Sequence, residues 1–86
     1  MSTTYETAER LFKLGDFQEL LNSTDLNIAS IQRLAIPHQL LIAHALALLG
    51  DGQLGIQILR GVDASSCSPA LRSKSHLVLG VIHERA

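Results

Sequence analysis

Apolar residues recur at helical spacing along most of this chain. Ala8 is followed by Leu11 and Phe12, three and four positions later, and this spacing places all three on one face of a helix. The pattern predicts a first helix over residues 4–14. A short second helix is expected to follow, with the Asp16 side chain as its N-cap.

The middle of the chain is expected to contain a break, a short helix and a long helix. Residues 22–27 are mostly polar and predict the break, whereas the apolar spacing within 28–36 predicts the short helix. Pro37 suits the first turn of the next helix, because the N–H that proline lacks would have no helical partner there. We expect this helix to run to Leu49.

Two more helices are expected in the last third of the chain. One covers residues 53–60 and is predicted to end at Gly61. The other covers 69–85, with Ser68 as its cap and proline in its first turn. No segment alternates apolar and polar residues as a strand does, so the chain is predicted to be all-α.

Two Gly-Asp pairs mark a repeat in this pattern. Gly15-Asp16 and Gly50-Asp51 lie 35 residues apart, and each separates two predicted helices. Glycine tolerates the left-handed conformation that ends a helix, and aspartate commonly begins the next one. A helix–turn–helix unit that recurs at this period is typical of stacked helical hairpins, which usually serve as binding surfaces.

This unit resembles the tetratricopeptide repeat, a helical hairpin of about 34 residues. When the two Gly-Asp turns are aligned, Ala8 and Ala43 fall on the small residue of the first helix, and Gly80 takes that place in an incomplete third unit. The resemblance implies stacked antiparallel helical hairpins in one domain over 1–86, with approximate repeats 1–35 and 36–68 and a half repeat 69–86.

The resemblance also implies a concave groove lined by the first helix of each hairpin. Spacing places the candidate residues of each helix on a common face. Such a groove is mostly apolar and fits the apolar face of an amphipathic helix from a protein partner. The candidate partner-binding residues are Tyr5, Glu9, Phe12, Leu40, His44, Leu48, Leu77 and Val81.

The chain is also similar to the chaperones of type III secretion needle subunits. The similarity lies in the small size, the number of repeats, the apolar bias and the sequence Leu49-Gly50-Asp51-Gly52. This similarity implies a cytoplasmic protein that pairs with a small helical co-chaperone. It also implies that the groove holds a helix of the needle subunit and so prevents premature polymerisation. The alternative that stays open is a structural or oligomerisation module of a larger repeat protein.

The composition suggests that a partner covers part of the surface. Hydrophobic residues make up 47% of the 86 residues, and charged residues only 17%, against roughly 25% in an average domain. The run from Leu77 to Ile82 is apolar almost all round its helix. We therefore expect self-association or a partner at the last helix, and close approach of another helix at Gly80.

Charge and hydropathy argue against two other classes of partner. The formal net charge is −1 and no basic cluster is present, so the footprint of a nucleic-acid or anionic-membrane binder is missing. The longest apolar run, residues 40–49, is too short to span a bilayer. The N-terminus does not resemble a signal peptide, and the single Cys67 suits a reducing compartment.

The sequence shows no arrangement typical of an enzyme or a metal site, so neither activity nor cofactor is expected. His76 and His83 share a helix face, but two turns separate them by about 10 Å, too far for one ion. No base is identifiable for Cys67, and the Asp16 and Asp51 carboxylates are interpreted as helix caps rather than as a catalytic pair.

Overall fold

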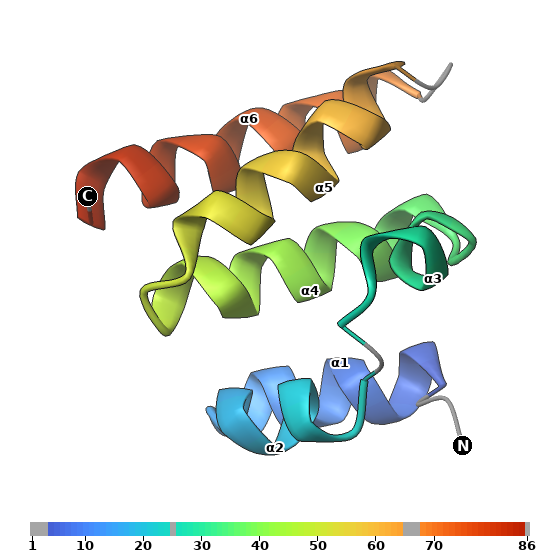
Figure 1. The fold of residues 1–86 in the computed structure, drawn as a ribbon, viewed down its shortest axis with the longest axis vertical. Helices are drawn as coiled ribbons and strands as arrows, with labels where there is room; N and C mark the ends of the chain where they lie inside the picture. The colour runs from blue at the N-terminus through green and yellow to red at the C-terminus, as the bar shows by residue number, and fades with distance from the viewer. Residues whose placement is uncertain (1–3, 25, 65–67, 86) are drawn as a thin grey trace.

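A computed structural model describes residues 4–24, 26–64 and 68–85, and within these ranges the protein is built of helices without strands. This confirms the all-α prediction (Figure 1). Cys67 lies outside the described residues. The helices of the described part are α1 (Tyr5–Leu14), α2 (Phe17–Asn22), α3 (Ile28–Gln32), α4 (Ile36–Leu48), α5 (Gly52–Ala64) and α6 (Pro69–Arg85).

The helix α4 lies at the centre of the array. It contacts α1 and α2 on one side and α5 and α6 on the other, as Figure 1 shows. The last two helices also contact each other, and α3 packs on α5. Large aliphatic side chains fill the space between these helices, and those that are fully buried are Leu20, Ile31, Ile42, Leu46, Ile58 and Val62.

The two Gly-Asp turns have the same backbone geometry. Gly15 has φ +81° and Gly50 has φ +93°, so both are left-handed as predicted. In each turn the glycine N–H donates to the carbonyl three residues earlier, and the aspartate N–H donates to the carbonyl five residues earlier. This bonding pattern satisfies the free carbonyls at a helix C-terminus, so both turns end a helix by the same mechanism.

Hydroxyl side chains cap the starts of two helices, of which the sequence predicted the cap at Ser68. The Thr4 hydroxyl accepts a hydrogen bond from the Thr7 N–H at 3.3 Å, and the Ser68 hydroxyl accepts from the Leu71 N–H at 3.3 Å. Asp16 precedes α2, but its side chain makes no capping bond, so that prediction is wrong. Its ψ of 59° differs from the extended value, near 157°, at Thr4, and capping geometry requires the extended conformation.

The prediction that Gly61 ends a helix is also wrong, because α5 continues to Ala64. Gly61 lies inside this helix and faces α3. A Cβ at Gly61 would stand 3.3 Å from Nε2 of Gln32, closer than most Cβ contacts. Glycine therefore allows close approach here instead of reversing the chain.

The predicted close approach at Gly80 is not observed. A Cβ built on Gly80 would meet no atom within 4 Å, and the residue is exposed. The close contacts lie instead at Gly52 and Gly55 of α5, where a Cβ would meet the Ile82 side chain at 2.9 and 3.1 Å. Glycines in α5, rather than in α6, bring these two helices together.

A buried glutamine joins α3 to α4. Gln39 is only 3% exposed, and its Nε2 donates to the carbonyls of Leu34 at 2.8 Å and Gln32 at 3.3 Å. These bonds satisfy backbone groups at the end of a helix that is too short to satisfy them itself. No helix within the described residues combines the length and the apolar character needed to cross a bilayer.

Candidate functional site

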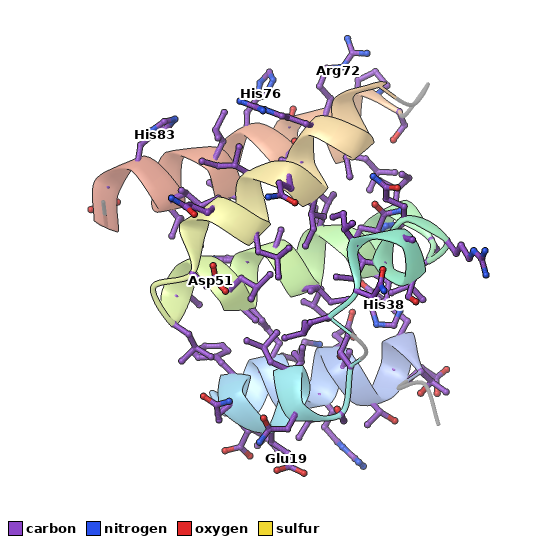
Figure 2. All side chains as sticks on the ribbon, viewed as in Figure 1. Glu19, His38, Asp51, Arg72, His76 and His83 are labelled. Carbon is purple, nitrogen blue, oxygen red and sulfur yellow. The ribbon has the colours of Figure 1, made fainter. Side chains whose placement is uncertain are left out.

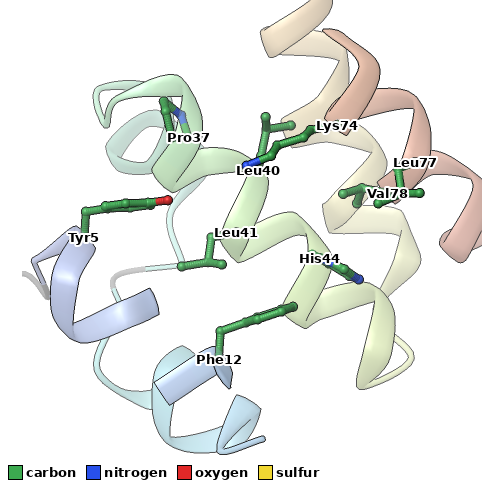
Figure 3. Close-up of a pocket in the computed structure, with 9 residues that line it drawn as sticks. All are labelled: Tyr5, Phe12, Pro37, Leu40, Leu41, His44, Lys74, Leu77 and Val78. Carbon is green, nitrogen blue, oxygen red and sulfur yellow. The ribbon is translucent and has the colours of Figure 1, made fainter. Parts of the chain in front are cut away.

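A cavity of about 180 Å³ lies where α1, α4 and α6 meet. Figure 3 shows the α4 side chains between Tyr5 and Phe12 on one side and the α6 side chains on the other. Six of the nine lining side chains are aliphatic, aromatic without a polar atom, or proline. The lining residues are Tyr5, Phe12, Pro37, Leu40, Leu41, His44, Lys74, Leu77 and Val78.

Helical spacing in each element brings these side chains together. Tyr5 and Phe12 are two turns apart on α1, and Leu40 and His44 are one turn apart on α4. On α6, Lys74 and Val78 are likewise one turn apart. The cavity is therefore formed by one face from each of three helices.

The structure brings five of the eight predicted site residues to this cavity: Tyr5, Phe12, Leu40, His44 and Leu77. The other three, Glu9, Leu48 and Val81, do not line it. Glu9 accepts a hydrogen bond from the Lys13 ammonium at 3.4 Å. Val81 packs against the core, and Leu48 is half-buried at the end of α4.

Four lining residues were absent from the predicted set: Pro37, Leu41, Lys74 and Val78. Leu41 and Val78 each directly follow a predicted residue in the sequence. The prediction took only one line of residues along each helix. A cavity between helices is also lined by side chains that lie next to that line, and these were therefore not included. This adjacency was the available signal for both residues.

His44 and Phe12 form the contact between α4 and α1 at this site. Their ring centroids are 4.8 Å apart and the planes are tilted by 50°. Burial lowers the pKa of the His44 imidazole below its ordinary value, which favours the neutral form at neutral pH. His44 therefore packs on Phe12 as a neutral aromatic ring, and its two nitrogens add polar atoms to the cavity lining.

A second histidine, His38, lies beside the site and was not predicted. It is only 5% exposed, and its Nε2 has no hydrogen-bond partner among the described residues. The Tyr5 ring meets it edge-on at a centroid distance of 5.8 Å. Burial lowers the pKa of His38, and a charge on this ring would lack compensation inside the α1–α4 contact.

Glu9 and Lys74 lie near the cavity, and their charges differ in how far other side chains compensate for them. The Tyr5 hydroxyl, followed by Lys13, holds the pKa of the Glu9 carboxyl below its usual range. Partial burial, followed by the same carboxylate, raises the pKa of the Tyr5 phenol. Lys74 lines the cavity, is exposed, and forms no ion pair with the described residues.

A second cavity, of about 260 Å³, lies between α5 and α6 and is lined by Ile56, Leu59, Arg60, Leu79 and His83. It contains none of the predicted site residues. Within the described residues, no three histidine, cysteine, aspartate or glutamate side chains gather as metal ligands would. The cavity between α1, α4 and α6 is therefore the candidate site.

No family model, no curated protein and no solved structure matches this chain. The helices and side chains described above therefore provide the basis for the function proposed below.

Proposed function

We propose that this protein is an adaptor or chaperone that holds an amphipathic helix of a protein partner against α1, α4 and α6. The observation that carries this proposal is the cavity at the junction of these three helices, with its mostly apolar lining. Leu77 is 63% exposed at this cavity. A large aliphatic side chain at the edge of an apolar hollow gains contacts when a partner covers it.

The order of helix contacts supports the proposal. The first helix of each predicted hairpin, α1, α4 and α6, packs on the next one in the series. The helices α2 and α5 follow the two matching Gly-Asp turns and pack against α4 and α6. This is the order expected for stacked tetratricopeptide-like hairpins, with α3 as an additional element that packs on α5.

The proposed mechanism is the masking of an apolar face. A partner helix that buries its apolar stripe in the groove cannot use that stripe for self-assembly until it is released. Each large aliphatic side chain that becomes buried contributes about 1.5–3 kcal/mol before the costs of association. The narrower form of the proposal is a cytoplasmic chaperone of a secretion needle subunit, assisted by a small helical co-chaperone.

Two leucines provide a matched test of the groove. Leu77 and Leu14 are 63% and 68% exposed, but only Leu77 lines the cavity. We would select binders from a displayed library of amphipathic helices about five turns long. The selected peptides would then be measured with the wild type and with the variants Leu77→Gln and Leu14→Gln.

The expected result is that Leu77→Gln weakens binding roughly tenfold, because one aliphatic contact is lost. Leu14→Gln is expected to bind like the wild type. Circular dichroism of both variants checks that the helices remain. Equal binding by Leu77→Gln and the wild type, or a failure to select any helical peptide, would refute the groove as the binding site.

The exposed Leu77 also favours a second candidate, an oligomerisation module that covers this face of α6 with another copy of the chain. Light scattering of the purified protein separates the two candidates. A dimer that Leu77→Gln converts to a monomer would support the module. A wild-type monomer that binds the selected peptides would support the adaptor.

A further inference from the structure

The polar groups of the cavity indicate which chemistry the docked helix carries. Only Tyr5, His44 and Lys74 contribute polar side-chain atoms to its lining, and none of the nine lining residues is acidic. The remaining lining is apolar, as Figure 3 shows. A partner helix therefore meets a mostly apolar surface that holds one permanent positive charge.

The protein compensates for this charge only weakly. Glu9 is the acidic residue of α1 that interacts with Lys74, and Lys74 is the weakest of the influences that lower the Glu9 pKa. The Glu9 carboxylate is paired with Lys13, at 3.4 Å. Among the described residues, Lys74 has no ion-pair partner.

Docking of a helix would remove part of the water around Lys74. A partly desolvated ammonium loses hydration, and a carboxylate that pairs with it compensates for that loss. We propose that the partner helix presents one acidic side chain to Lys74 from within its apolar face. This inference rests on the proposed function, and it narrows the partner to an amphipathic helix with a carboxylate flanked by aliphatic residues.

A side-chain carboxylate fits this site better than the carboxylate at the end of a chain. Lys74 is the only lysine or arginine in the lining. The Tyr5 phenol is uncharged at neutral pH because the ordinary pKa of tyrosine is about 10, and burial lowers the pKa of His44, which favours its neutral form. A terminal carboxylate is commonly captured by several converging backbone N–H donors, and the polar groups that line this cavity are side chains. Peptides with an amidated C-terminus therefore distinguish the two sources directly.

The test uses synthetic peptides whose sequences come from the displayed-library selection, with acetylated and amidated ends. Each acidic residue is replaced in turn by glutamine, and binding is measured by fluorescence anisotropy. The proteins are the wild type, Lys74→Gln and Arg72→Gln. Arg72 is exposed on the same helix and lies outside the cavity, so its variant removes an equal charge at another place (Figure 2).

We expect one Glu→Gln replacement in the peptide to weaken binding about threefold to fivefold with the wild type and with Arg72→Gln. With Lys74→Gln, the same replacement is expected to change affinity less than about twofold, because the pair no longer exists. Added salt should reduce the difference for the wild type.

Two results would overturn the inference and leave the proposed function standing. One is the selection of groove-binding helices without an acidic residue in the apolar face. The other is an equal effect of Glu→Gln with the wild type and with Lys74→Gln. Failure of the wild type to bind any helical peptide would instead refute the proposed function, and the inference with it.

Discussion

The two ends of the helical array pack on α4 in the same arrangement, but they bury different numbers of apolar side chains. The helices α5 and α6 contact α4 and also each other. The helices α1 and α2 make their main contacts with each other and with α4. Among the described residues, the apolar side chains buried in α1 and α2 are Ala8, Leu20 and Leu21, whereas those buried in α5 and α6 are Ile58, Leu59, Val62, Val78 and Ile82.

This difference matters because the candidate site spans both ends. Tyr5 and Phe12 belong to the lightly attached α1, and Leu77 and Val78 belong to the firmly packed α6. Segments with few buried apolar contacts open at lower free energy than the core. We therefore expect the α1 wall of the groove to open first and to control access to the site.

The largest effect is expected for a core substitution at the α5 side. Ile58 is fully buried in α5, and Ile58→Ala removes three carbon atoms and leaves a cavity. We expect the free energy of unfolding to fall by about 4 kcal/mol. Urea denaturation followed by circular dichroism measures this change. A loss below about 1 kcal/mol would contradict tight packing of the core at this end.

A matched substitution at the other end should act locally. Leu20 is fully buried in α2, and Leu20→Ala is expected to weaken the attachment of α1 and α2 by about 3 kcal/mol. Hydrogen exchange should show lost protection in residues 5–22 and retained protection in 36–64. If protection falls equally in both segments, the two ends unfold as one unit and the comparison fails.

Substitutions in the two Gly-Asp turns also compare the two ends, and their expected effect on stability is smaller. Alanine at Gly15 or Gly50 must adopt a left-handed conformation, which costs about 1 kcal/mol. Gly15→Ala should loosen α1 and α2 alone, whereas Gly50→Ala should lower the stability of the whole protein. Both effects can be followed by hydrogen exchange.

Gly80→Ala provides the control for these turn variants. Gly80 lies within α6 and faces open space. Alanine is favoured over glycine inside a helix by about 1 kcal/mol, so this variant should raise the melting temperature. A decrease would show that some contact does depend on the glycine.

Local signals in the sequence explain which parts of the fold were predictable. The helix starts at Thr4 and Ser68 and the left-handed turns at Gly15 and Gly50 depend on residues adjacent in the chain. The continuation of α5 through Gly61 was missed because its cause is distant. Gly61 accommodates Gln32 of α3, and this packing is not visible in the local pattern.

The candidate site was predictable in part for the same reason. Periodicity identifies one stripe per helix, and five residues of that stripe do line the cavity. It does not show how far each helix is rotated about its axis, and this rotation places Lys74 at the cavity and Val81 against the core. Periodicity also gave no reason to distinguish the buried His38 from the exposed His76 and His83.

The smallest expected effect concerns pH and again separates the two ends. Burial lowers the pKa of both His38 and His44, and both rings pack against α1 through Tyr5 and Phe12. In the unfolded chain these histidines bind protons near pH 6.5. The attachment of α1 is therefore strongest above that pH and weakens as the pH falls from 6.5 toward the lower folded pKa values.

The variant His38→Phe/His44→Phe tests this dependence, because phenylalanine keeps a ring at both contacts and cannot bind a proton. The measurement is hydrogen exchange of residues 5–14 between pH 7.5 and pH 5.5, corrected for the intrinsic exchange rate. In the wild type the protection of these amides should fall as the pH is lowered, and in the variant it should change less. His76→Gln/His83→Gln is the control, since both side chains are exposed on α6 and lie far from α1 (Figure 2). A wild-type response that persists in the phenylalanine variant would assign the acid weakening to groups other than the two buried histidines.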